Sequence, residues 1–192
     1  MMNSREKILQ AVAANKPDFE ELPLLDLSQA VRYGDVCNEF IRVLRSIGGN
    51  VIYLESKKYL RDDIEEEGRS GRSVVNALED IVSDKQGSMK AQELASVHKY
   101  YVRGRLGVAE NGAVWIDESV TGNRLLPFIC QHLVIVLRAD NIVSNMHDAY
   151  REINTEATGF GVFVAGPSRT ADIEQNLVIG AHGPAFLSVY LI

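Results

Sequence analysis

The stretch "GPSRTADIEQNLVIGAHGP", residues 166–184, holds the densest set of side chains that could do chemistry in this sequence. The planar guanidinium of Arg169 is suited to binding a carboxylate or a phosphate. The residues beside it share hydrogen-bonding ability through hydroxyls or carboxylates: Ser168, Thr170, Asp172 and Glu174. Two interpretations stay open, since the carboxylates could hold Arg169 in an internal clasp, or Arg169 could bind an anionic ligand.

Two further residues could take part in catalysis. His182, in "GAHGP", could be an acid–base group or a hydrogen-bond donor near Arg169, or its ring could be held by a backbone carbonyl. Glu110 lies in "AENG", where a turn glutamate can project into a cleft as nucleophile or base, or simply face water. We expect Arg169, His182 and Glu110 to line one solvent-reachable hollow.

No metal site or cofactor is expected from the sequence. The other histidines, His98, His132 and His147, show no metal-ligand spacing. The two cysteines, Cys37 and Cys130, form no CxxC pair and no iron–sulfur or disulfide framework. Such cysteine usage fits a reducing cytoplasm.

Helices and apolar strands that alternate along the chain must position these residues. Apolar residues at three- and four-residue spacing predict helices at 4–14, 36–47, 74–82 and 141–153. Ser4 and Asp35 are candidate N-caps, and Gly48-Gly49 is a stop signal. Apolar runs predict strands at 50–55, 132–137, 159–165 and 185–192, and "RLGVAENGAVWID" predicts a hairpin around Asn111-Gly112. The charged segment 57–73 is typical of a solvated helix face followed by a turn, rather than a binding site.

This order of elements predicts an α/β fold with a mostly parallel sheet between helical layers. The strand "GFGVFVA" should end at the carboxyl edge of that sheet, where open α/β sheets place ligands, so that residues 166–170 emerge there. We expect an N-terminal helical arm at 1–34 and one domain at 35–192.

Composition restricts the class of protein. A net charge of −6 argues against nucleic-acid binding, because no basic face is apparent. The longest apolar runs are too short to span a bilayer, and the first residues lack the apolar block of a signal peptide, so we expect a cytoplasmic protein. An exposed strand edge could support a homodimer, although no feature demands one.

The pattern "GPSRTADIE…LV.G.HGP", together with "GVAENG", resembles the lactate-utilisation (LUD) domain family, of the small type called lactate utilisation protein C. The resemblance covers most of the chain from Asp35 onward. It implies a Rossmann-like α/β/α sandwich similar to the sugar-phosphate isomerase and coenzyme A transferase group. It also implies an accessory role in oxidising L-lactate to pyruvate, beside iron–sulfur partner proteins. Position 111 is Asn where relatives often carry a hydroxyl residue.

Three functions remain open from this resemblance. In the first, an accessory subunit uses a cleft near Arg169 to bind a small carboxylate or to dock a partner. In the second, "AENG" is similar to the "SENG" turn of coenzyme A transferases, which would make Glu110 the nucleophile of an acyl- or coenzyme A-handling enzyme. In the third, a non-catalytic module binds a carboxylate or a sugar phosphate through Arg169.

Overall fold

The computed structural model describes residues 3–21, 23–78, 91–155, 158–173 and 176–192. The chain divides into two compact units, residues 1–30 and 31–192. The first unit contains the predicted helix α1 (Ser4–Ala14), which is capped by Asn3 rather than Ser4: the Asn3 side chain accepts a hydrogen bond from the Glu6 N–H, and the Glu6 carboxylate accepts one from the Asn3 N–H. The predicted domain boundary after residue 34 stays a prediction.

The second unit is built on a fully parallel sheet of five strands. In spatial order the strands are β1 (Asn50–Tyr53), β11 (Phe186–Leu191), β6 (His132–Leu137), β3 (Lys99–Arg103) and β2 (Val74–Asn76). Parallel strands need crossover connections. In chain order, α3 (Lys57–Arg69) lies between β1 and β2, α4 (Ala91–Leu94) between β2 and β3, and α5 (Glu118–Thr121) and α6 (Leu126–Ile129) between β3 and β6, whereas α2 (Val36–Ser46) precedes β1. The predicted α/β fold is confirmed.

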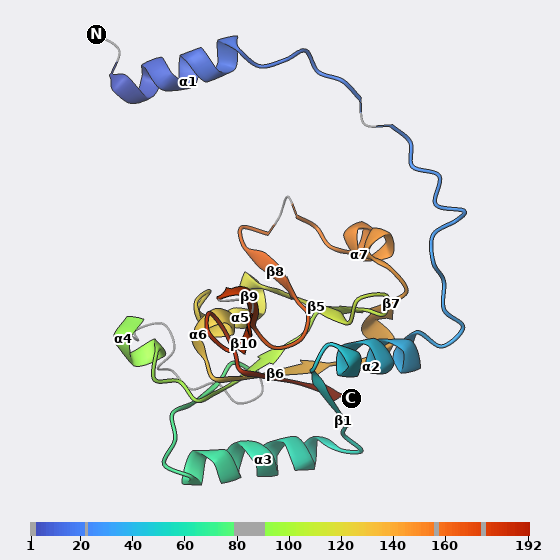
Figure 1. The fold of residues 1–192 in the computed structure, drawn as a ribbon, viewed down its shortest axis with the longest axis vertical. Helices are drawn as coiled ribbons and strands as arrows, with labels where there is room; N and C mark the ends of the chain where they lie inside the picture. Colours follow the sequence, from blue (N-terminus) through green and yellow to red (C-terminus); the bar gives the residue numbers. More distant parts are fainter. Residues whose placement is uncertain (1–2, 22, 79–90, 156–157, 174–175) are drawn as a thin grey trace. The chain divides into compact units, whose positions relative to one another are not determined.

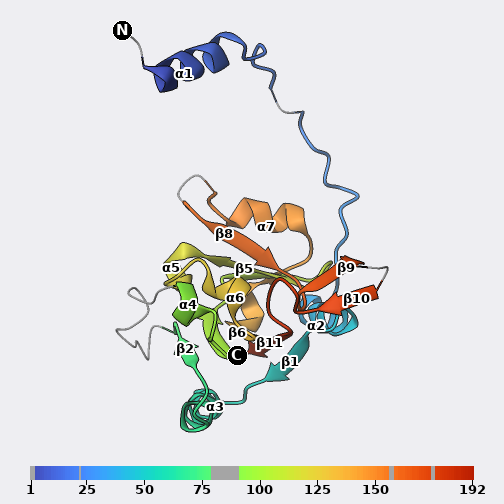
Figure 2. The ribbon, with the colours of Figure 1, turned by 60° about the vertical axis from the view of Figure 1, so that its left-hand side comes forward.

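The two faces of the parallel sheet have different coverings. Alternate residues of β3, β6 and β11 point to opposite faces, as strand geometry requires. One face packs against α3 through Leu60, Tyr101, Val134 and Tyr190. The other face packs against α2 and a second sheet, and Figures 1 and 2 show α3 on the opposite side of the parallel strands from β5.

The second sheet has the spatial order β7 (Ile142–Val143), β4 (Leu106–Val108), β5 (Ala113–Asp117) and β8 (Gly161–Val164). The predicted hairpin is confirmed, because β4 and β5 pair antiparallel and Gly112 between them has φ +67. Helix α7 (Met146–Glu152) covers the outer face of this sheet through Ala149. The parallel sheet therefore has α3 on one side and, on the other, a second sheet with α7 beyond it (Figure 1).

Two expectations about strands and helices were wrong. The strand "GFGVFVA" is β8, which pairs antiparallel with β5 in the second sheet and does not end at the carboxyl edge of the parallel sheet. Gly161 allows this pairing, because a Cβ there would lie 2.1 Å from the Trp115 ring. The predicted helix at 74–82 begins as strand β2, since the β-branched Val74 and Val75 pair with β3; residues beyond 78 of that prediction lie outside the described part.

The predicted helix at 141–153 is shorter than expected. Strand β7 occupies Ile142–Val143, and α7 begins only at Met146, after the N-cap Asn145. Within the described segments, every helix is too short or too polar to cross a membrane.

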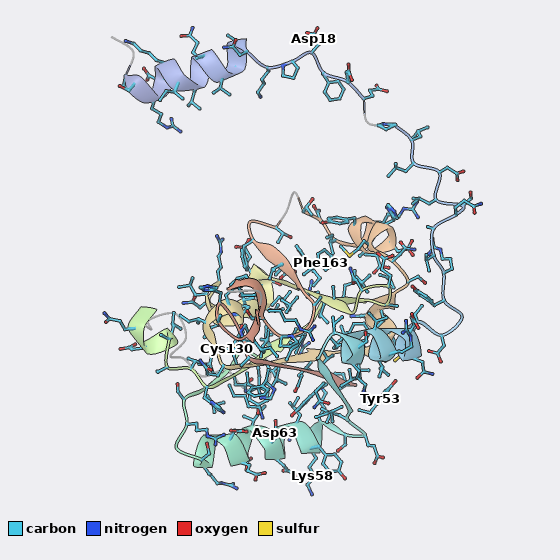
Figure 3. The ribbon with its side chains drawn as sticks, viewed as in Figure 1. Asp18, Tyr53, Lys58, Asp63, Cys130 and Phe163 are labelled. Carbon is cyan, nitrogen blue, oxygen red and sulfur yellow. The ribbon has the colours of Figure 1, made fainter. Side chains whose placement is uncertain are left out.

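A buried cation fixes α3 to the parallel sheet. Lys99 of β3 is only 4% exposed, and its Nζ lies 3.2 Å from both carboxylate oxygens of Asp63 and 3.1 Å from Glu67 Oε1. The hydroxyls of Tyr101 and Tyr190 also donate to Asp63, at 2.7 and 2.9 Å. Figure 3 shows Asp63 on the side of α3 that is turned to the sheet, with Lys58 on the side turned away.

Removing that cation should destabilise the fold. In Lys99→Met, Asp63 and Glu67 would stay half-buried without their cation, so we expect a loss of about 3 kcal/mol in the free energy of unfolding. Urea unfolding measures this change. Arg69→Met is the control, because the exposed Arg69–Glu65 pair on the same helix should be worth less than about 0.5 kcal/mol. Equal losses in the two variants would contradict the assignment.

The same cluster predicts a pH dependence. Burial raises the pKa of Asp63, but the hydrogen bond from Tyr101 and the charge of Lys99 outweigh it and hold that pKa below the ordinary 3.8. A lowered folded-state pKa stabilises the fold at pH values above the ordinary one, and this stabilisation is lost as pH falls through the lowered value. Asp63→Asn should therefore flatten the acid limb of stability against pH, measured by urea unfolding between about pH 2 and 5. An unchanged acid limb would contradict this.

Candidate functional site

The segment 166–184 lies at the amino edge of the parallel sheet, opposite to the edge we expected. It forms an antiparallel hairpin of β9 (Arg169–Ile173) and β10 (Asn176–Ile179), followed by a loop that leads into the first residue of β11. The physical reason is the pairing of β8 with β5, which carries the chain away from the carboxyl edge. Within this segment, Gly166 and Gly180 adopt φ values of +73 and +75, which favour glycine.

Arg169 reaches the C-terminal end of α2. Its Nη2 donates to the Ile47 carbonyl at 2.5 Å, beside Gly48, whose φ of +92 favours glycine. A guanidinium at this place satisfies a free carbonyl and complements the negative end of the helix dipole. The side chain is exposed, so the contact leaves part of the guanidinium open to solvent. Of its predicted carboxylate partners, Glu174 lies outside the described residues, and for Asp172 only the backbone, in β9, is described.

The loop that carries His182 is attached to Ser168. The Ser168 N–H donates to the Pro184 carbonyl and its carbonyl accepts from the Gly180 N–H, both at 2.9 Å. His182 itself is exposed, and Thr170 pairs with Val178 in the hairpin. The backbone therefore brings His182, Ser168 and Arg169 into one local structure. Their roles in ligand binding and catalysis stay predictions.

Glu110 is directed at α7. Its Oε1 accepts a hydrogen bond of 2.8 Å from the Met146 N–H, the first residue of α7, and this contact complements the positive end of that helix. The turn itself rests on α2, because a Cβ on Gly112 would lie 3.0 Å from the Leu44 backbone. This use of the carboxylate is structural, and a nucleophilic role for Glu110 stays a prediction.

The three residues expected to share a hollow have different contacts. The Glu110 turn and Arg169 both rest on the second half of α2, at Leu44 and Ile47. Among the described residues, however, no hydrogen bond or ion pair joins Glu110 to Arg169 or to His182. None of the three lines the cleft beside Leu60 and Val136, the one beside Tyr53 and Asp63, or the one beside Val36 and Asp148.

A different site occupies the carboxyl edge of the parallel sheet, which is the usual place for a ligand in this class of fold. A cleft of about 310 Å³ opens there between α3 and the strand ends. Five basic side chains line it: Lys57, Arg61, Arg103, Arg105 and Arg138. Its other lining residues are mostly apolar: Leu60, Leu78, Gly104, Val136, Asn141 and Ile192. None of the described lining residues is acidic, so the cleft is suited to binding an anion.

Strand alternation explains why the basic residues converge. Lys99, Tyr101 and Arg103 are alternate residues of β3, and Tyr101 packs on the face covered by α3. Arg103 is therefore on that same face at the strand's carboxyl end, and Arg105 follows two residues later. In β6, Val136 also packs on the α3 face, and Arg138 continues its alternation.

The sequence analysis did not find this cleft. Its basic residues come from segments separated by up to eighty-one positions, with Lys57 and Arg138 as the extremes, so no local motif joins them. The available signal was the alternation in "KYYVR", which places Lys99, Tyr101 and Arg103 on one face of a strand. The prediction that 57–73 is a solvated helix and turn was correct for α3, but Lys57 and Arg61 at its N-terminal end line the cleft.

The contact of Glu110 with α7 can be tested directly. Glu110→Ala removes the acceptor for the Met146 N–H, so we expect a loss of about 1 kcal/mol in the free energy of unfolding, as for a lost helix cap. Glu110→Gln keeps an oxygen acceptor and should lose less. Glu55→Ala, at an exposed loop glutamate, is the control and should change stability by less than about 0.5 kcal/mol in the same urea unfolding. If Glu110→Ala is as stable as the wild type, the contact contributes nothing.

Comparison with known proteins agrees with the fold and the motif. The chain is 33% identical over 91 residues to lactate utilization protein C of Bacillus pumilus, a match that covers 44% of this chain and 38% of that protein. It is 31% identical over 107 residues to lactate utilization protein C of Shouchella clausii, covering 53% of this chain and 45% of that protein. These matches span less than half the length of the curated relatives.

A solved structure has the same fold. The crystal structure of a DUF162 family protein from Deinococcus radiodurans aligns with a TM-score of 0.62 at 15% sequence identity, covering 88% of this chain and 99% of that chain. The model of the LUD domain matches residues 71–192, which include β3, β6, β11 and the whole segment 166–184. The chain therefore belongs to the LUD domain family.

Proposed function

We propose that this chain is a LUD-domain subunit of an L-lactate utilisation system and that its cleft at the carboxyl edge binds an anionic ligand. The lactate part rests on the similarity to lactate utilization protein C of Bacillus pumilus and Shouchella clausii. The anion-binding part is carried by one observation: five basic side chains line a cleft in which no described lining residue is acidic.

The oxidation of lactate needs an electron acceptor, and in this proposal iron–sulfur partner proteins supply it. The chain has two cysteines, whereas an iron–sulfur cluster usually takes about four cysteine ligands. Cys130 is fully buried and burial raises its thiol pKa to about 12, which disfavours the thiolate that a metal needs. Among the described residues, no group of three or more histidine, cysteine or acidic side chains could hold a metal ion. The proposed role is therefore to bind and present an anion rather than to carry electrons.

Deletion of the gene in the organism that carries it should prevent growth on L-lactate as the sole carbon source, while growth on pyruvate continues, because the block lies before pyruvate. Growth rate and the rate of L-lactate oxidation in washed cells measure the effect. The wild-type gene supplied on a plasmid should restore both rates.

Two variants of the plasmid gene, supplied to the deletion strain, test whether the cleft is needed for growth on L-lactate. The double variant Arg61→Gln/Arg105→Gln removes two exposed charges from the cleft and should fail to restore growth on L-lactate. Arg69→Gln removes an exposed charge at the far end of α3 and should restore it fully. Normal L-lactate oxidation in the deletion strain would refute the lactate proposal. Full rescue by the double variant would refute the role of the cleft.

A further inference from the structure

We infer that the cleft at the carboxyl edge binds an organic diphosphate, with the two phosphoryl groups held by the basic side chains and the organic part against the apolar inner wall. This inference rests on the anion-binding role proposed above and narrows it to one class of ligand. The argument uses the charge of the cleft, the end of α3 beside it, its size and the chemistry of its lining.

The cleft concentrates positive charge in an acidic protein. The whole chain has a net charge of −6 and 20 Lys and Arg residues, yet five of those 20 lie among the eleven described residues that line this one cleft. Like charges gathered in a partly apolar cleft repel one another and raise the free energy of the empty protein. A ligand with several negative charges removes this repulsion, whereas a monocarboxylate would neutralise one charge only.

Two of the arginines that line the cleft have ion pairs with acids beside it. Arg105 Nε lies 3.6 Å from Asp117 Oδ2, and Arg138 Nη2 lies 3.3 Å from Asp140 Oδ2. The side chains of both arginines are more than half exposed, and surface pairs of this kind are weak. Both guanidiniums can therefore turn to a phosphate at small cost.

Helix α3 adds to the positive potential. Its first residue, Lys57, and its fifth, Arg61, line the cleft, and its first turn contains no acidic residue. The N-terminal end of a helix carries a partial positive charge, which basic residues do not neutralise. A phosphate bound in the cleft beside this end of the helix would therefore be stabilised by it.

The size and lining of the cleft suit a ligand larger than a small carboxylate. A volume of about 310 Å³ equals roughly ten water molecules at about 30 Å³ each, so L-lactate would leave most of it to water. Guanidinium groups hold phosphate through paired hydrogen bonds. Three of the lining residues at or just beyond strand ends are arginines: Arg103, Arg105 and Arg138. Apolar residues of α3, of β6 and just after β11 also line the cleft and could contact an organic group: Leu60, Val136 and Ile192.

Isothermal titration of the purified full chain with ADP, pyrophosphate, inorganic phosphate and L-lactate tests this inference. We expect pyrophosphate to bind at least about tenfold more tightly than L-lactate, with an affinity that falls steeply as salt is raised. We expect ADP to bind several-fold more tightly than pyrophosphate, because only ADP has an organic part to contact the apolar wall. Ile192→Ser should remove that advantage and leave pyrophosphate binding unchanged.

The charge variants locate the site. Arg61→Gln and Arg105→Gln should each weaken pyrophosphate binding by about tenfold, the loss of one charge-assisted hydrogen bond, while Arg69→Gln should bind as the wild type does. Thermal melts without ligand confirm that each variant is folded. L-Lactate binding as tight as pyrophosphate, and weakened by the same variants, would overturn the diphosphate inference and leave the proposed anion role standing. If ADP binds no more tightly than pyrophosphate, the inferred contact between an organic group and the apolar wall is wrong. If none of the four anions binds, both the diphosphate inference and the proposed anion-binding role are wrong.

Discussion

The parallel direction of the five central strands is the constraint on which the rest of this structure depends. Because β1, β11, β6, β3 and β2 all run the same way, every strand enters the sheet at one edge and leaves at the other. The chain must return across the sheet between strands, which buries both faces and makes the two edges chemically different. The amino edge carries the LUD motif segment 166–184, and the carboxyl edge carries the basic cleft.

The elements with strong local signals could be predicted from the sequence. Asp35 caps α2 through the Asn38 N–H, and the Asn-Gly pair closes the β4–β5 turn with the Asn111 side chain accepting from the Ala113 N–H. The apolar run of β6 lies at the centre of the parallel sheet, buried on both faces, as its composition indicated. In each case the deciding interaction lies within a few residues of the signal.

The pairing of strands could not be predicted, because it depends on residues far apart in the chain. Both an edge strand of the second sheet and a central parallel strand can be short and apolar, so "GFGVFVA" did not reveal that Gly161 would lie beneath the Trp115 ring. The four-residue spacing of Val74 and Leu78 fits a helix, yet these two residues pack in one cluster on the α3 face from a strand and the loop after it. The cleft could not be predicted for the same reason, because Arg61, Arg103 and Arg138 come together only when α3 lies across the strand ends.

Helix α3 connects the stability of the fold to the geometry of the cleft. Asp63 and Glu67 in its second half bind the buried Lys99 of β3, and this contact sets the rotation and the position of the helix on the sheet. Because the helix is continuous, fixing its later turns on the sheet also fixes the position of its first turns. The contacts of Asp63 and Glu67 with Lys99 therefore hold Lys57 and Arg61 at the carboxyl edge. Asp63 and Glu67 are thus paired with a cation inside the fold, while Lys57 and Arg61 line the cleft. One helix is therefore both an anchor on the parallel sheet and one wall of the cleft.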